Sequence, residues 1–393
     1  MPLPNWWLAV LNEDWRHGGF GLYIHWPFCE AKCPYCDFNS YVSPNVDDGI
    51  WEKALLSELD RHAELTQGRL LNSIFFGGGT PSLMPPSTVE RLINRALGHW
   101  TAANNIEITL EANPSSVEAA RFTGFRAAGV NRISMGIQAL NDPDLKQLGR
   151  LHSVAEAMAA LEIAKQTFDR VSFDLIYARQ NQSLPEWRLE LAKAISLSDG
   201  HLSLYQLTIE PGTAFGFRAK AGKLRGLPDE DLAADMFDFT NETCSSAGLA
   251  GYEVSNYASS GLESLHNIIY WQGGDYIGIG PGAHGRLTLG GRRIATQTAL
   301  APTAWLDRVS LRSSGTVKSE VLSKTSHANE LIMMGLRLQG GISRSRVEAI
   351  ADQPLLIPKH LIELGLIELN NDEVRATDSG RPLLNQLIEA VMY

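Results

Sequence analysis

Six apolar runs of strand length alternate with segments of helical periodicity in the first half of the chain. No other sequence feature constrains the fold as strongly. The runs are LYIHW (22–26), SIFFGGG (73–79), IEITLEA (106–112), RISMGIQ (132–138), VSFDLIY (171–177) and LSLYQLT (202–208). Such alternation predicts βα units around a parallel sheet with right-handed crossovers. The periodicity alone is compatible with either a partial barrel or an open sheet.

Polar residues and glycines stand where these strands end, which is where parallel α/β folds bind ligands. The glycines at 77–79 let a backbone approach a ligand closely, and Glu111 can bind ribose hydroxyls. The Arg150 guanidinium can hold a carboxylate through two hydrogen bonds. Asp174 lies inside an apolar run, where a charge is costly unless it faces a partner or a ligand. Taken singly, these residues are more often a tight turn, a loop acid and a surface arginine.

Three of the four cysteines, Cys29, Cys33 and Cys36, form a CxxxCxxC motif. Thiolates suit iron–sulfur clusters, zinc and copper(I). Three cysteines can hold three corners of a [4Fe–4S] cluster and leave the fourth iron open to a small molecule. A zinc site with His25 as fourth ligand and a set of buried thiols are the alternatives. The absence of a second cysteine pair and the clustering of the three argue against both.

The composition excludes several classes of protein. The 393 residues carry a net charge of −10, which argues against a nucleic-acid-binding surface. No apolar run approaches the ~20 residues of a membrane span, and the N-terminal stretch, with Trp6 and Trp7, does not have the pattern of a signal peptide. Few cysteines, mostly clustered, are typical of a reducing compartment. We therefore expect a cytoplasmic protein with no nucleic-acid partner.

A second motif, HNIIYW, begins at His266. Histidine is a common metal ligand and a frequent axial ligand of haem, and aromatic residues can stack on a flat macrocycle. From this stretch alone, a satisfied histidine beside core aromatics is the more ordinary interpretation. The nearby GIGPGA (278–283) imitates a dinucleotide fingerprint, but Pro281 and the lack of a following helical pattern argue against that function.

The pattern changes again near residue 300. Helical stripes at 327–338 and 343–351 precede a helix and hairpin around an NND turn, and a final helix is expected at 379–392. These elements predict a small winged-helix-like module. Such modules often bind DNA, but the acidic chain has no basic stripe that would support this function.

The cysteine motif, its flanks YIHWPFC and CDF, and GGGTP together resemble the radical S-adenosylmethionine (SAM) superfamily. More narrowly, they resemble the group of oxygen-independent coproporphyrinogen III oxidases and HemW-type haem chaperones. The resemblance implies an α/β fold: a (βα)6 partial TIM barrel with a smaller C-terminal α+β domain, HemN-type and winged-helix-like, over its open end. It implies an N-terminal extension (1–18), a radical SAM core (19–215), a core extension with HNxxYW (216–300) and the C-terminal domain (301–393).

The same resemblance implies the site residues. Cys29, Cys33 and Cys36 are expected to hold a [4Fe–4S] cluster, with SAM at the open iron. The expected SAM-binding residues are Tyr23, Tyr35, Gly78, Gly79, Thr80, Glu111, Gln138, Arg150 and Asp174. The family's counterpart of GIGPGA closes over the SAM side of the barrel. The loop ARQNQS (178–183) departs from the Gly-Leu-Pro-rich loop common in the family, so no contact is transferred to it.

Two features separate the chaperones from the oxidases. HNxxYW matches a pattern associated with the chaperones, in which His266, Asn267, Tyr270 and Trp271 are expected to bind haem. The oxidases carry a further cysteine two residues after the third, where this chain has Phe38. We therefore expect a chaperone that transfers haem to an acceptor haem protein, such as a membrane respiratory protein. The alternative is a coproporphyrinogen oxidase, and the resemblance leaves open whether the protein is an enzyme. A homodimer and peripheral membrane contact are compatible with haem delivery.

Overall fold

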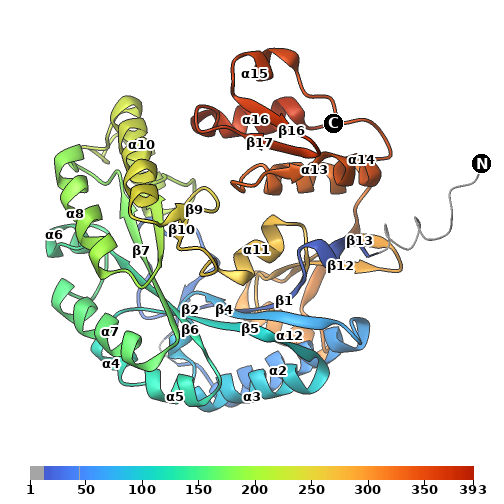
Figure 1. The fold of residues 1–393 in the computed structure, drawn as a ribbon. Coiled ribbons are helices and arrows are strands. Elements are labelled where there is room, and N and C mark those ends of the chain that lie inside the picture. The colour runs from blue at the N-terminus through green and yellow to red at the C-terminus, as the bar shows by residue number, and fades with distance from the viewer. Residues whose placement is uncertain (1–12, 44) are drawn as a thin grey trace, which may run out of the picture.

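A twelve-stranded sheet forms the body of the protein (Figure 1). The structure is a computed structural model that describes residues 13–43 and 45–393; most of the expected N-terminal extension, with Trp6 and Trp7, lies outside them. Six neighbouring strands are parallel and follow chain order. They are β1 (Phe20–Trp26), β4 (Leu70–Gly78), β5 (Thr101–Ala112), β6 (Arg132–Gln138), β7 (Arg170–Tyr177) and β8 (His201–Gln206). They coincide with the six predicted runs and confirm the parallel βα arrangement.

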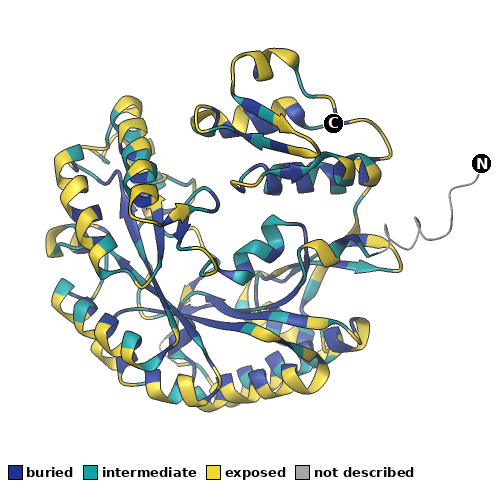
Figure 2. Ribbon diagram, in the orientation of Figure 1, coloured by how far each residue is buried: buried dark blue, intermediate teal, exposed yellow. Residues whose placement is uncertain are grey.

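Helices line the outer, convex side of this sheet, which leaves the inner side free for ligands (Figure 1). The helices of the first half are α2 (Asp48–Leu65), α3 (Pro86–His99), α4 (Ser116–Ala119), α5 (Phe122–Ala127), α6 (Asp142–Gln147), α7 (Val154–Thr167) and α8 (Leu184–Leu197). Capping boxes at Ser153 and Ser183 start α7 and α8, where each serine accepts from the backbone of a glutamate that bonds back to it. Figure 2 shows buried residues along the strands and exposed residues on the outward faces of the helices.

The sheet continues beyond both ends of the predicted parallel part. On one side, β11 (Asp275–Ile279) pairs parallel with β1, and β12 (His284–Leu289), β13 (Arg292–Thr298) and β14 (Thr316–Val321) follow as antiparallel strands. On the other side, β10 (Asn256–Ala258) and β9 (Ala250–Gly251) lie antiparallel beyond β8. These strands are short or polar, so they lack the apolar runs that identified the others. Within the described residues the outer strands β14 and β9 are not joined, so the barrel is open.

A separate C-terminal domain lies across this opening, above the HNxxYW helix α11 (Leu265–Trp271) (Figure 1). It consists of α13 (Lys324–Gly335), β15 (Ile342–Ser343), α14 (Arg344–Ala351), α15 (Lys359–Glu363), β16 (Ile367–Asn370), β17 (Glu373–Ala376), η3 (Arg381–Leu383) and α16 (Leu384–Val391). Its three strands form their own antiparallel sheet around a second hydrophobic core. The helices and hairpin predicted for this region are thus present.

The large core of the barrel and the core of the C-terminal domain divide the chain later than the expected boundary at 301. Helix α12 (Pro302–Arg312) packs on α2, where Trp305 stacks on Trp51 with ring centroids 5.3 Å apart, and β14 extends the large sheet. We therefore propose a boundary between β14 and α13. Arg346 of α14 donates to both carboxylate oxygens of Asp14 (2.7 and 2.8 Å) and to the Gln272 carbonyl (2.8 Å) directly after α11. These bonds fasten the C-terminal domain beside the HNxxYW helix.

The remaining elements are short or lie at the edges of the barrel. They are η1 (Asp14–His17), β2 (Phe28–Cys29), β3 (Tyr41–Val42), η2 (Pro81–Leu83), α9 (Ala214–Lys220) and α10 (Glu230–Ser246). Among the described helices, none combines the length and the hydropathy that a membrane span requires.

Candidate functional site

The three clustered cysteines lie on one loop at the carboxyl end of the parallel strands. Cys29 ends β2, and Cys33 and Cys36 follow in the loop toward β3. All three are free and half-buried, and they line one cavity of about 540 Å³. The Arg150 guanidinium lies 3.4 Å from the Cys33 sulfur. The loop therefore presents its thiols to the strand-end residues predicted as ligand-binding.

The donor set fits a cluster better than zinc. The expected fourth zinc ligand, His25, is already engaged: its Nδ1 lies 2.9 Å from the Tyr23 hydroxyl and its Nε2 lies 3.0 Å from the Asn39 carbonyl. Within residues 13–43 and 45–393, no three histidine, cysteine or acidic side chains are arranged around a single metal ion. A cubane cluster needs no such convergence, because each thiolate binds a different iron.

The glycines of GGGTP allow two chain segments to pack without side chains between them. Gly78 has φ +112°, and a Cβ there would lie 2.6 Å from the His25 ring. A Cβ at Gly79 would lie 2.7 Å from the Phe28 carbonyl oxygen. The Gly78 N–H donates to Glu111 across the strand ends (3.1 Å). The motif is therefore needed for the approach of the cysteine loop, in addition to any contact with a ligand.

Eight of the nine expected SAM-binding residues line the cavity that the cysteines line: Tyr35, Gly78, Gly79, Thr80, Glu111, Gln138, Arg150 and Asp174. Tyr23 is placed differently. Its hydroxyl bonds to His25 and its ring lies against His266, with centroids 5.7 Å apart. The structure thus puts Tyr23 between His25 on its own strand and His266 of the HNxxYW motif.

The cavity combines a cation with two carboxyl groups whose pKa values are raised. Arg150 donates to the Gly136 carbonyl (2.9 Å) and to Asn113 (2.5 Å), and its buried Nε has no partner. Burial, reinforced by the nearby Asp174 carboxylate, raises the pKa of Glu111 to about 8. Burial also raises the pKa of Asp174 to about 6. The site therefore offers a guanidinium for a ligand carboxylate and a protonated Glu111 that can donate to a hydroxyl.

The HNxxYW residues line a second cavity, of about 390 Å³, on the inner side of the barrel. Those that line it are His266, Asn267, Tyr270 and Trp271. The two cavities adjoin, because Glu111, Ser134, Asp174 and Tyr205 line both. The residues expected for the cluster, SAM and haem, distant in sequence, thus gather in one interior space.

His266 is held as a neutral imidazole. Its ring stacks on Phe75, with centroids 4.3 Å and planes 22° apart, and meets the edge of Tyr270. Its buried Nδ1 has no hydrogen-bond partner. Burial lowers the pKa of His266 to about 4, so the ring is uncharged near neutral pH. Neutral imidazole is the form that binds iron.

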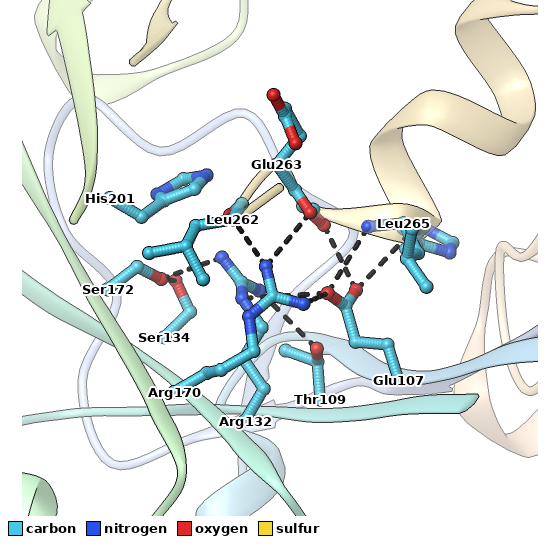
Figure 3. Close-up of polar contacts among 12 residues, drawn as sticks. Glu107, Thr109, Arg132, Ser134, Arg170, Ser172, His201, Leu262, Glu263 and Leu265 are labelled. Atoms are coloured by element: carbon cyan, nitrogen blue, oxygen red, sulfur yellow. Dashed lines mark hydrogen bonds and ion pairs between the residues drawn. The ribbon is translucent and has the colours of Figure 1, made fainter. Parts of the chain in front are cut away.

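A buried ionic network fixes the start of α11 (Figure 3). Glu107 of β5 accepts from the backbone N–H groups of Leu265 (3.2 Å) and His266 (3.3 Å) and from the Ser264 hydroxyl (3.2 Å). Arg170 lies 2.9 Å from Glu107 and also donates to two carbonyls of the preceding loop. Burial opposes ionisation of Glu107, but Arg132 and Arg170 outweigh it and lower its pKa.

Our sequence analysis missed this network, although its signal was present. Glu107 lies in the apolar run IEITLEA, four residues before Glu111 and on the same face of the strand. The argument that singled out Asp174, a charge inside an apolar strand, applies equally to Glu107.

The glycine-rich stretch GIGPGA packs against the cysteine loop. Gly280 and Gly282 both have positive φ (+95° and +79°), and a Cβ on Gly280 would lie 2.2 Å from the His25 carbonyl oxygen. Asn39, three residues after Cys36, donates to the Pro281 carbonyl (3.0 Å). A strand, β12, follows the stretch, which confirms that it is no dinucleotide fingerprint.

Comparison with known families and structures agrees with this architecture. Residues 23–188 match the family model described as the radical SAM superfamily, and residues 322–383 match the HemN C-terminal domain. The fold is similar to that of coproporphyrinogen III oxidase (HemN) from Escherichia coli, with a TM-score of 0.80, 22% identity, and coverage of 98% of this chain and 93% of that chain. The likeness confirms the expected barrel with its HemN-type C-terminal domain.

Curated relatives extend over nearly the whole chain. The heme chaperone HemW of Escherichia coli is 39% identical, covering 94% of this chain and 97% of its own length. HemW of Haemophilus influenzae is 38% identical, covering 94% of this chain and 96% of its own length. The mouse mitochondrial radical S-adenosyl methionine domain-containing protein 1 is 39% identical, covering 93% of this chain and 86% of its own length. The chain therefore belongs to the HemW family of the radical SAM superfamily.

Proposed function

We propose that the protein binds haem beside the HNxxYW helix and transfers it to an acceptor haem protein. The observation that carries this proposal is His266: a neutral imidazole on the wall of a cavity that adjoins the cysteine cavity. Tyr270 and Trp271 line the same cavity and offer aromatic surface to a porphyrin. The relatives named as heme chaperones support the same function.

The cysteine cavity would hold the resident cofactors. Cys29, Cys33 and Cys36 would bind a [4Fe–4S] cluster, whose open iron would hold SAM when bound. In this proposal Arg150 pairs with the SAM carboxylate and Glu111, protonated at neutral pH, donates to a ribose hydroxyl. Tyr35, Gly78, Gly79, Thr80, Gln138 and Asp174 complete the proposed pocket.

Phe38 favours delivery of haem over oxidase chemistry. Its side chain is 63% exposed at the edge of the cysteine cavity, where the oxidases carry a cysteine. A phenyl ring neither binds iron nor transfers a proton.

The acceptor is proposed to be a haem protein, such as a membrane respiratory protein. The carrier is proposed to be cytoplasmic and to touch the membrane peripherally or to act as a homodimer.

An anaerobic haem titration of the cluster-reconstituted protein, followed by Soret absorbance, tests the proposal. Wild type should bind about one haem per chain with saturation. His266→Phe, which keeps the stacking surface but removes the nitrogen ligand, should weaken binding and shift the Soret band. His360→Ala, on the exposed helix α15, is the matched control and should bind as wild type does.

The same protein should also be assayed for coproporphyrinogen conversion. Absence of saturable haem binding together with turnover would replace the chaperone by the oxidase. Haem binding that is unchanged in His266→Phe would retain the function and assign the iron ligand to another residue.

A further inference from the structure

One arginine of the C-terminal domain lines the HNxxYW cavity, and a second lies behind it. Arg337, directly after α13, lines the cavity with His266 and Tyr270. Arg381, which starts η3, lies behind it and donates to the Arg337 carbonyl (3.5 Å). The domain that covers the barrel opening thus supplies positive charge to a cavity whose other walls belong to the barrel.

Within the described residues neither arginine forms an ion pair, although Asp378 acts electrostatically on Arg381 from a longer distance. Arg337 donates only to neutral acceptors, the Met333 carbonyl and Asn385 (3.3 Å). The buried Nη2 of Arg381 has no partner. In the part of the chain that the structure describes, no carboxylate oxygen lies within 4.0 Å of either guanidinium. Burial lowers the pKa of both groups, and burial of an unpaired cation is costly.

One carboxylate oxygen of an acid that lines the same cavity is already engaged. Glu253, from the barrel side, lines the same cavity and influences both guanidiniums electrostatically. Its Oε1 already accepts from the Ser255 N–H (2.9 Å) and from the Asn256 amide (2.6 Å).

Two more deeply buried arginines of this chain do have carboxylate partners. Arg179 lies 2.6 Å from both Asp144 and Glu190, and Arg293 lies 2.5 Å from Asp275. Among the described residues, Arg337 has no such pair at the cavity edge, where a ligand's carboxylate would supply one.

We propose that Arg337, with Arg381 behind it, binds the propionate carboxylates of haem while the HNxxYW helix faces the ring. This inference rests on the proposed haem binding. Haem carries its two propionates on one edge, and guanidinium binds carboxylate through two parallel hydrogen bonds. The C-terminal domain thereby becomes part of the binding site, and the site selects tetrapyrroles with free acids.

A comparison of haem with its dimethyl ester tests the proposal. Both ligands are titrated into the full-length, cluster-reconstituted protein under the same detergent conditions. Wild type should bind haem about tenfold more tightly than the ester, or better, because the ester cannot form a charge-assisted pair. Arg337→Gln should lose most of this preference by weakening haem binding while leaving ester binding unchanged. Arg337→Lys should retain part of it.

Arg375→Gln is the control, since this half-exposed arginine of the same domain pairs with Glu368 away from the cavity. It should keep the wild-type preference. Equal binding of haem and ester by wild type would overturn the inference alone, as would an equal loss of both ligands in Arg337→Gln. Wild type that binds neither ligand would instead overturn the proposed function.

Discussion

Replacement of Glu107 by glutamine should destabilise the barrel and loosen the HNxxYW helix together. The carboxylate is 2% exposed and accepts from two backbone N–H groups and one hydroxyl at the start of α11, while Arg170 pairs with it at 2.9 Å. Glutamine keeps one acceptor oxygen but leaves the Arg170 and Arg132 charges unbalanced. Breaking a buried pair costs about 3–5 kcal/mol, and the retained acceptor places Glu107→Gln near the lower value, about 3 kcal/mol.

Urea unfolding measures this loss, and the haem titration measures its effect on His266. Glu64→Gln, which removes the exposed partner of Arg61, should cost less than about 1 kcal/mol. The folded-state pKa of Glu107 is lowered, so its contribution is present above the unfolded pKa and disappears as pH falls through the folded pKa. Glu107→Gln should lack this acid-dependent loss. A cost below about 1 kcal/mol with unchanged haem affinity would refute the anchoring function.

Two further substitutions address packing. His62→Leu should stabilise the protein by about 2 kcal/mol at about pH 5 and by little near pH 7.5. Burial lowers the pKa of His62 to about 4, and neither ring nitrogen has a partner among the described residues, so between this pKa and the unfolded value of about 6.5 the unfolded chain binds the proton more readily. Urea unfolding that shows an equal gain at both pH values would contradict this prediction. Gly78→Ala should lower the free energy of unfolding by about 2 kcal/mol or more and lower the iron content after reconstitution, because its Cβ would meet the His25 ring at 2.6 Å. Gly222→Ala is the control: Gly222 has φ +66° but no atom within 4 Å of an added Cβ, so this variant should keep its iron.

The sequence predicted the parts of the fold that depend on local patterns. The six apolar runs became parallel strands because helices cover the outer side of the sheet that they form. The residues at their ends converge because neighbouring parallel strands end on the same side of the sheet. The strands from β11 to β14 were not predicted, since pairing with β1 and with one another, rather than an apolar run, stabilises them.

A site residue could be predicted where its residue type and its position at the end of a strand were enough to place it. Tyr23 could not be placed from its strand alone, because its contact with His266 joins segments more than 200 residues apart. Arg337 was missed for the same reason: only the docking of the C-terminal domain brings it to the cavity, with Arg381 behind it.

Delivery of haem tests the central claim most directly. Haem-loaded protein is mixed with membranes that contain a haem-free respiratory oxidase, and oxygen consumption is followed beside free haem at the same concentration. The account predicts that the loaded wild type restores respiration faster than free haem and that His266→Phe loses this advantage. Restoration no faster than with free haem, with the haem retained on the protein, would contradict the account.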